Sequence, residues 1–181
     1  MDKKFEEWAK QVSTLHLPRW EELPDMDLYR DQVITLIERY LSFLANDDEK
    51  IITTSMINNY VKWKMMPAPN RKKQYNRVHL GYLIVITILK QVVNIKDIKN
   101  GIELLASQRG THNAYNLFCL QMEISLKNVL ALCVDSISFD EKYKAIEEDE
   151  IVLSMGTLSF ASKLVAVKKL ELENHEIKNK E

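Results

Sequence analysis

The chain has 181 residues, 46% of them apolar and 28% charged, which suits one domain with a helical extension and allows a sizeable core. Only four glycines and four prolines occur, which argues against a turn-rich β-sandwich, while abundant Leu, Ile, Lys and Glu favour helices. The formal net charge of −1 predicts no general attraction of the whole chain to nucleic acid.

Apolar residues at helical spacing predict an amphipathic helix over residues 2–12. Pro18 and Pro24 interrupt the chain after it, because a proline disfavours helix at the residue before it. Asp25 or Asp27 is a candidate cap for the next helix, which is expected to run to about Ala45.

A polar turn at 46–50 precedes a short helix of about residues 55–65, which Pro67 and Pro69 end. The polar, basic stretch Asn70–Asn76 is expected to form a loop or a short β-hairpin. A long helix of about 78–93 follows, apolar nearly all round and therefore central. Later helices are expected at about 96–105, 112–134, 140–148 and 150–172, and the charged tail from Glu173 is expected to fray.

The charges are distributed unevenly along the chain. Residues 1–49 hold six Lys/Arg and twelve Asp/Glu, whereas residues 50–96 hold nine Lys/Arg and no acid at all. Residues 97–181 hold ten Lys/Arg and fourteen Asp/Glu. The acid-free stretch Lys50–Lys96 therefore points to an anionic partner, of which nucleic acid is the usual one.

The short helix has two distinct faces. Ile57, Tyr60, Val61 and Met65 form an apolar face, and Ser55, Asn58, Asn59 and Lys62 form the opposite polar face. Asn side chains donate and accept together, as reading an adenine edge in the major groove requires, and Ser and Lys suit phosphate contact. Taken alone, this face fits an ordinary solvated surface better than a binding surface.

The run Asn70-Arg71-Lys72-Lys73-Gln74-Tyr75-Asn76-Arg77 follows soon after the helix and holds four cations. Alone, this run also fits a solvated loop. A basic loop beside a polar helix, however, is the arrangement of a winged helix-turn-helix, in which the helix enters the major groove and the wing follows the backbone. The two features together favour DNA contact.

The segment 54–86 also carries a family resemblance, in Thr54-Ser55-Met56-Ile57-Asn58-Asn59-Tyr60-Val61-Lys62, Pro67, Lys73-Gln74-Tyr75-Asn76, Leu80, Leu83 and Ile86. These residues resemble the DNA-binding half of the MerR superfamily. Together with residues 17–24, Leu28 and Tyr29, they more closely resemble a MerR-like bacterial family catalogued as a domain of unknown function, with suspected repressors among its members. Asn58 stands where the superfamily usually has Arg, and Lys64 where it has Gly. By the resemblance, Tyr75 lies where the wing meets the following helix and reaches a phosphate.

The expected fold is mainly α, a MerR-like winged helix-turn-helix domain with a C-terminal helical dimerisation region. We expect an N-terminal helical arm and linker over 1–26, the DNA-binding domain over 27–108, the helical dimerisation or effector region over 110–172, and a frayed tail over 173–181. The expected function is sequence-specific double-stranded DNA binding as a transcriptional regulator, with repression favoured over activation. The candidate DNA-binding residues are Thr54, Ser55, Asn58, Asn59, Lys62, Lys64, Arg71, Lys72, Lys73, Tyr75, Arg77 and His79.

No enzyme motif is found, and we expect no catalytic residue, metal or other cofactor. The four histidines are scattered, without a second His or Cys at metal-ligand spacing. Cys119 and Cys133 lie about 21 Å apart on one predicted helix, too far for a disulfide, and are expected to be buried thiols in a reducing compartment. The start of the chain lacks the apolar core of a signal peptide, and the apolar runs at 81–89 and 151–167 fall short of a membrane span, so a cytoplasmic location is expected.

The C-terminal helices are apolar on more than one side, so they need more than one neighbour. We therefore expect a homodimer through them, with room for a small-molecule effector that nothing in the sequence identifies. The alternative is a protein-interaction module that binds an acidic partner through the same basic surface.

Overall fold

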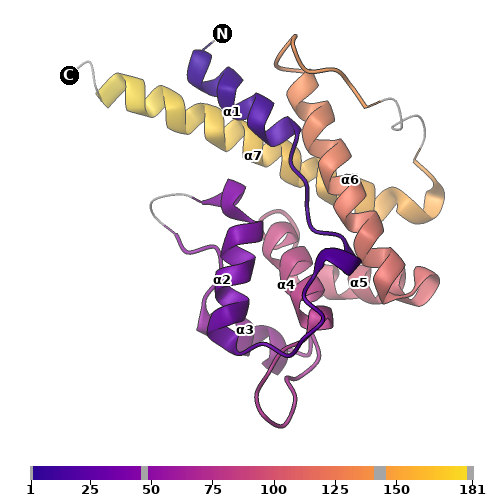
Figure 1. Cartoon of the computed structure of the whole chain (residues 1–181). Coiled ribbons are helices and arrows are strands. Elements are labelled where there is room, and N and C mark those ends of the chain that lie inside the picture. The colour runs from indigo at the N-terminus through magenta and orange to yellow at the C-terminus, as the bar shows by residue number, and fades with distance from the viewer. Residues whose placement is uncertain (1, 46–48, 141–145, 179–181) are drawn as a thin grey trace. The chain divides into compact units, whose positions relative to one another are not determined.

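The computed structural model describes residues 2–45, 49–140 and 146–178. The protein is mainly helical, as predicted (Figure 1). Its α-helices are α1 (Lys3–Ser13), α2 (Arg30–Tyr40), α3 (Thr54–Lys62), α4 (Arg77–Leu89), α5 (Ile95–Arg109), α6 (Thr111–Ala131) and α7 (Ile151–Lys178), with 3₁₀ helices η1 (Trp20–Glu22), η2 (Ser42–Leu44) and η3 (Glu148–Glu150).

The chain divides into two compact units. The central unit is Leu17–Leu117, and the terminal unit combines Met1–His16 with Phe118–Glu181. The boundaries differ from the predicted ones, because residues 17–26 of the predicted arm and the first turns of α6 both belong to the central unit.

Local caps explain where the helices of the central unit begin. Thr53 accepts a hydrogen bond from the Met56 amide (3.2 Å) at the start of α3, and Asn76 accepts one from Val78 (3.1 Å) at the start of α4. Asn94 accepts one from Asp97 (3.0 Å) at the start of α5. Gly110, with φ of 76°, ends α5 in a conformation that glycine adopts without strain.

Helix α4 is the centre of this unit, and both α2 and α5 pack against it. Its side chains are buried on nearly every side, which agrees with its almost continuous apolar sequence. Each fully buried Leu or Ile contributes about 1.5–3 kcal/mol. The largest wholly buried aliphatic residues of the unit are Leu17, Leu23, Ile37, Leu41, Ile52, Ile57, Leu80, Leu83 and Ile84.

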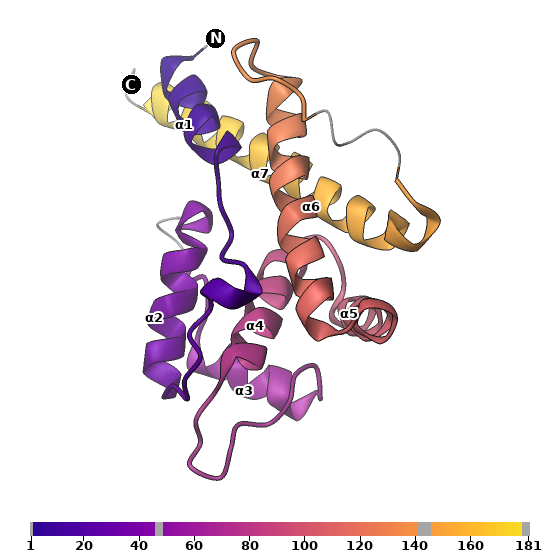
Figure 2. The same cartoon turned by 45° about the vertical axis from the view of Figure 1, so that its right-hand side comes forward.

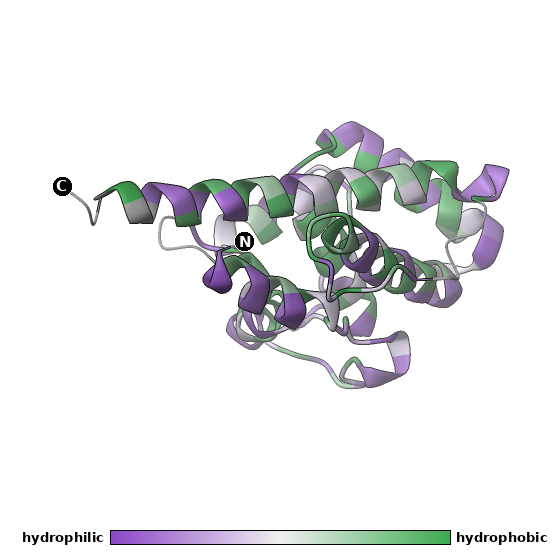
Figure 3. Cartoon of the chain, turned by 90° about the horizontal axis from the view of Figure 1, so that it is seen from above, coloured by the Kyte–Doolittle hydropathy of each residue, from purple (hydrophilic) through white to green (hydrophobic). Residues whose placement is uncertain are grey.

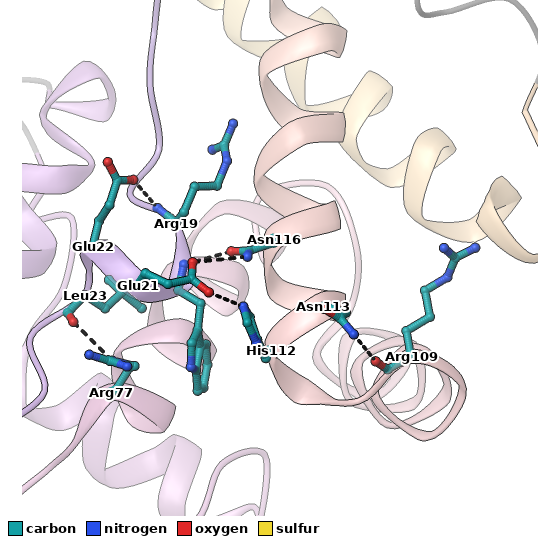
Figure 4. A network of polar contacts seen from close by, with 10 residues as sticks. Arg19, Glu21, Glu22, Leu23, Arg77, Arg109, His112, Asn113 and Asn116 are labelled. Carbon is teal, nitrogen blue, oxygen red and sulfur yellow. Dashed lines mark hydrogen bonds and ion pairs between the residues drawn. The ribbon is translucent and has the colours of Figure 1, made fainter.

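The segment before α2 is held against the first turns of α6 by a polar network (Figure 4). The Tyr115 hydroxyl donates to the Pro18 carbonyl (2.8 Å), and the Trp20 amide donates to Asn116 Oδ1 (2.8 Å). Glu21 pairs with His112, as Figure 4 shows. These bonds explain why residues 17–26 belong to the central unit.

In the terminal unit, α1 lies along α7 (Figure 1). Helix α1 buries Phe5, Ala9 and Val12, which share one face at i, i+4 and i+7. Helices α6 and α7 meet at a buried hydrogen bond of 2.9 Å between the hydroxyls of Ser125 and Thr157.

Two predicted elements differ from the structure, and for a third, the basic stretch 70–76, one of the two predicted alternatives is found. In the described part of 140–148, residues 140 and 146–147 are not helical and only Glu148 begins η3; residues 141–145 lie outside the described residues. The sequence predicts fraying from Glu173, but α7 continues to Lys178. No strand forms within the described ranges, so the basic stretch is a loop rather than a β-hairpin.

Helix α7 carries apolar bands along its length, which alternate with hydrophilic bands toward its C-terminus (Figure 3). The stretch Glu148–Asn174 is long and apolar enough to cross a membrane by length and composition alone. Core helices of soluble proteins meet the same criterion, so this is weak evidence for a membrane.

Candidate nucleic-acid interface

The polar face of α3 is exposed as the helical spacing predicts. Ile57 and Tyr60 point into the core, where burial raises the pKa of the Tyr60 phenol. The opposite side chains lie on the surface and include a single cation, Lys62. The exposed residues of this polar face are Thr54, Ser55, Asn58, Asn59 and Lys62.

Helix α3 ends in a Schellman motif that forms without its usual glycine. The Met65 amide donates to the Tyr60 carbonyl (2.9 Å), and the Lys64 amide donates to the Val61 carbonyl (3.0 Å). Lys64 adopts a left-handed φ of 54° and exposes its side chain. The turn therefore carries a cation at a left-handed position, which a residue with a side chain adopts only with strain.

Trp63 is a surface residue that the sequence analysis missed. It lies one turn after Asn59, and its side chain is 50% exposed. It therefore extends the polar face of α3 with a large aromatic ring between Lys62 and Lys64. Its i+4 spacing from Asn59 predicts a position on the exposed face, but a tryptophan is usually assigned to the apolar face of a helix.

The basic loop, residues 70–77 up to the first residue of α4, is held at its base by two anchors, a backbone bridge and a histidine ring. Leu28 and Tyr75 exchange backbone hydrogen bonds of 2.7 and 2.8 Å as an isolated antiparallel bridge. The ring of His79 accepts from the Asn76 amide at Nδ1 (3.0 Å) and lies 3.2 Å from the Ala68 carbonyl at Nε2. Nδ1 also lies 2.8 Å from Asn76 Oδ1, so the ring of His79 joins Asn76 to Ala68 at the two ends of the loop.

Asn70 organises the tip of the loop. Its Oδ1 accepts from the amides of Lys72 (2.9 Å) and Gln74 (3.0 Å). The Asn70 amide donates to the Gln74 carbonyl (3.0 Å), which closes the turn. Lys73 takes a left-handed φ of 60° within it. Arg71, Lys72 and Lys73 are consequently all exposed on a short loop that projects away from α3 and α4 (Figures 1 and 2).

The structure corrects two of the expected DNA-binding residues. Tyr75 is 1% exposed and His79 is 5% exposed. Their rings pack edge to face with centroids 5.3 Å apart. Tyr75 therefore cannot reach a phosphate from this position, and both residues support the loop instead of forming its surface.

The charge of the region is also less one-sided in space than along the chain. The Leu28–Tyr75 bridge brings Asp25 and Asp27 to the loop. Arg77 Nη2 lies 3.7 Å from Asp25, and Asn70 Nδ2 donates to Asp27 (3.1 Å). Arg77 also donates to the Leu23 carbonyl (3.1 Å), so it is tied to the fold, as Figure 4 shows.

Lys90 belongs to the acid-free stretch but not to the exposed surface. Its Nζ lies 3.4 Å from Met56 Sδ, and burial lowers the pKa of its ammonium group. The exposed cations that remain near α3 and the loop tip are Lys62, Lys64, Arg71, Lys72 and Lys73.

The connection from α2 to α3 differs from a tight helix-turn-helix. Thirteen residues, 41–53, separate the two helices and include η2. The usual motif has a turn of about three or four residues. The polar helix and the basic loop are therefore present without the short turn of that motif.

The described residues contain no group of three or more His, Cys, Asp or Glu side chains placed to hold a metal ion. Cys119 is buried as expected, but Cys133 is exposed because α6 ends at Ala131 and the chain turns there. Neither cysteine forms a disulfide.

Comparison with known proteins gives one family match. Residues 18–118, more than half of the chain, match the family model described as "Domain of unknown function (DUF1836)". These limits agree with those of the central unit to within one residue. No curated protein and no solved structure matches the chain.

Proposed function

The chain belongs to the DUF1836 family, and we propose that it is a sequence-specific double-stranded DNA-binding protein that acts as a transcriptional regulator, most simply a repressor. The observation that carries the proposal is the pairing of two surfaces. The polar face of α3 is exposed opposite buried Ile57 and Tyr60, and the loop that follows exposes three cations at its tip.

Each surface suits one part of DNA recognition. An α-helix fits the major groove, where amide side chains such as those of Asn58 and Asn59 pair with adenine. Thr54 and Ser55 at the start of α3 suit phosphate oxygens. The loop tip, with Arg71, Lys72 and Lys73, supplies contacts to the backbone, which position a protein without reading sequence.

The base of the loop supports this division of roles. A wing contributes to affinity only if its cations are held out from the fold, because ordering a free loop costs conformational entropy on binding. The hydrogen bonds of Leu28, His79 and Asn70 order the loop before DNA arrives.

The first test is a selection of bound sequences from a random duplex library, followed by fluorescence anisotropy with the selected duplex. The triple variant Arg71→Glu, Lys72→Glu, Lys73→Glu is compared with Lys3→Glu, Lys4→Glu, Lys96→Glu. The control also reverses three exposed cations, but none of them lies at α3 or the loop tip.

The loop variant should weaken binding to all duplexes alike. Its log–log salt slope should flatten by about 0.9 for each phosphate that the loop no longer neutralises. The control variant should keep a steeper salt slope and a higher affinity than the loop variant. An equal weakening in the two variants would mean that net charge alone drives binding, and would overturn the assignment of the loop.

The second test concerns sequence preference. Asn58→Ala and Asn59→Ala should each change the selected sequence and cost about 1–3 kcal/mol on the original duplex. If both variants select the same sequence as the wild type and bind it with undiminished affinity, the proposal that α3 lies in the major groove is wrong. Failure of the wild-type chain to enrich any sequence would overturn the proposed function.

A further inference from the structure

Helix α7 has one covered side and one uncovered side. Ser154, Thr157, Phe160, Ala161 and Val165 are buried, and the Ser125–Thr157 hydrogen bond lies on this covered side. The uncovered side carries large apolar side chains at both ends of the helix. The exposed large apolar residues of α7 are Ile151, Val152, Met155, Val167, Leu170 and Ile177.

The middle of the uncovered side is different. Ser159, Ser162 and Ala166 are exposed there, and Gly156 is partly exposed. These small residues allow another helix to approach closely. Large apolar side chains therefore lie toward the ends of the uncovered side, and its middle carries small residues together with one long side chain, that of exposed Lys163.

The positions of these residues are symmetric about the level of Ala161. Val152 and Leu170 lie equally far before and after it, and the interval between the two is about five whole turns. Both therefore fall on one line along the helix, opposite buried Ala161 and at the middle of the uncovered side. Placed antiparallel about this centre, Val152 of one helix faces Leu170 of the other.

The flanking positions match in size in the same arrangement. Met155 faces Ala166 of the second helix on one side of the midline, and Val167 faces Gly156 on the other. In these two flanking pairs a bulky side chain meets a small one, and Ser159 lies opposite Lys163 near the centre. In each of the four pairs, the midpoint between the two residue numbers lies within half a residue of position 161.

We propose that α7 is a homodimerisation helix, which packs antiparallel on α7 of a second copy of this chain about Ala161. A two-fold interface requires that one surface complement itself, and this face does so at four pairs of positions. The contact from Val152 to Leu170 spans about 27 Å of helix, enough for a sustained helix–helix interface.

A lipid membrane is the other partner that an apolar helix suggests. The small polar residues and Lys163 at the middle of the exposed face argue against it, because a charge at the centre of a bilayer is costly. In the antiparallel pair, the flexible Lys163 side chain extends to the edge of the contact, where it keeps its ammonium group in water.

The dimer does not depend on the proposed DNA binding. If both hold, two copies of α3 are related by a two-fold axis, and the selected DNA sequence is an inverted repeat. A dimer that selects no sequence would separate the two proposals, as would a monomer that binds a single half-site.

The test is sedimentation velocity of the full chain with two variants that change the same two positions. Val152→Glu with Leu170→Glu places like charges opposite each other, whereas Val152→Glu with Leu170→Lys places opposite charges together. In a parallel pair, the second variant would instead bring Glu against Glu and Lys against Lys. Circular dichroism and thermal unfolding establish that each variant folds.

We expect a dimer for the wild type, a loss of at least about 100-fold in dimer affinity for the Glu/Glu variant, and recovery of the dimer for the Glu/Lys variant. As a control, Leu104→Glu with Leu132→Glu changes two exposed leucines outside α7 and should leave the dimer intact.

The proposal would be overturned if the wild type were monomeric at a protein concentration of about 100 μM, or if the Glu/Glu variant stayed dimeric. If the Glu/Lys variant also fails to form a dimer, the antiparallel register is excluded. Should the charged variants misfold, Val152→Ala with Leu170→Ala replaces them and must weaken the dimer. Binding of the wild-type monomer to phosphatidylcholine–phosphatidylglycerol vesicles would identify a membrane as the partner instead.

Discussion

Leu28 and Tyr75 are joined by two backbone hydrogen bonds, of 2.7 and 2.8 Å, across 47 positions of sequence. This one bridge sets the base of the basic loop and brings two carboxylates, Asp25 and Asp27, beside it. The loop is therefore both ordered and partly neutralised by a segment that precedes α2.

The two carboxylates should weaken DNA binding. Replacing Asp25 and Asp27 by Asn keeps the oxygen that accepts from Asn70 but removes two negative charges. Because exposed charge interactions are worth about 0.2–1 kcal/mol, the affinity should rise about two- to fivefold, and the salt slope should steepen. Anisotropy at two salt concentrations measures both. Glu7→Gln with Asp135→Asn removes the same charge elsewhere and should have a smaller effect; an equal effect would contradict a local role.

Tyr75 should contribute to stability and not to DNA contact. Tyr75→Phe keeps the buried ring and should leave the affinity and salt slope within about twofold of wild type. Tyr75→Ala should cost about 3–5 kcal/mol of folding free energy by leaving a cavity. Urea unfolding and anisotropy separate the two effects. A tenfold drop in affinity in a stable Tyr75→Phe variant would show that the phenol reaches the DNA.

Trp63 should contribute an apolar contact to the DNA interface. Trp63→Ala should weaken binding by about 1 kcal/mol without changing the salt slope, because the substitution removes no charge. Trp63→Phe should retain most of the affinity. Binding should alter the tryptophan fluorescence of the wild type, and Trp63→Phe should abolish that change while Trp8→Phe should not. A fluorescence change that persists without Trp63 would place the ring outside the interface.

Lys64 should lower stability through its backbone and raise DNA affinity through its charge. A left-handed conformation costs a residue with a side chain about 1–2 kcal/mol, part of which glycine returns as entropy of the unfolded chain. Lys64→Gly should therefore stabilise the fold by about 0.5–1 kcal/mol and weaken DNA binding. Lys64→Ala should weaken binding equally without the gain in stability. Equal unfolding free energies for the two variants would contradict the strain.

Glu21 should make the central unit sensitive to acid. The hydrogen bond from its own backbone, with contributions from Asn116 and His112, lowers the pKa of the Glu21 carboxyl below its usual 4.5. A lowered pKa in the folded state stabilises the protein above about pH 4.5, and this contribution disappears as the pH falls through the folded-state value. Urea midpoints between pH 7 and pH 3 should fall less steeply for Glu21→Gln than for wild type. Glu38→Gln, also exposed, should follow the wild type; identical slopes for all three would contradict the role of Glu21.

The helices were predictable because their signals are local. Capping residues such as Thr53 and Asn94 and apolar residues at helical spacing indicate where a helix starts and which side it buries. The polar face of α3 followed from the same spacing, and all four of its predicted residues, Ser55, Asn58, Asn59 and Lys62, are exposed.

The loop and its supports were harder to predict because they depend on distant contacts. Tyr75 and His79 look like surface residues beside a basic run, but the bridge to Leu28 and the contact with Ala68 bury them. Counting acids along residues 50–96 also missed Asp25 and Asp27, because proximity in space does not follow chain order. The turn at Asn70 does have a local sequence signal, because an Asn four residues before Gln74 favours a turn. The overall composition of the segment does not show this signal.

The left-handed lysines at 64 and 73 have a consequence for how this surface changes over generations. Glycine at either position relaxes the backbone, so selection for thermal stability alone would replace both lysines. Selection for tight DNA binding would keep them. The residues found at these two sites in a population of randomised variants would therefore record which of the two pressures had acted on it.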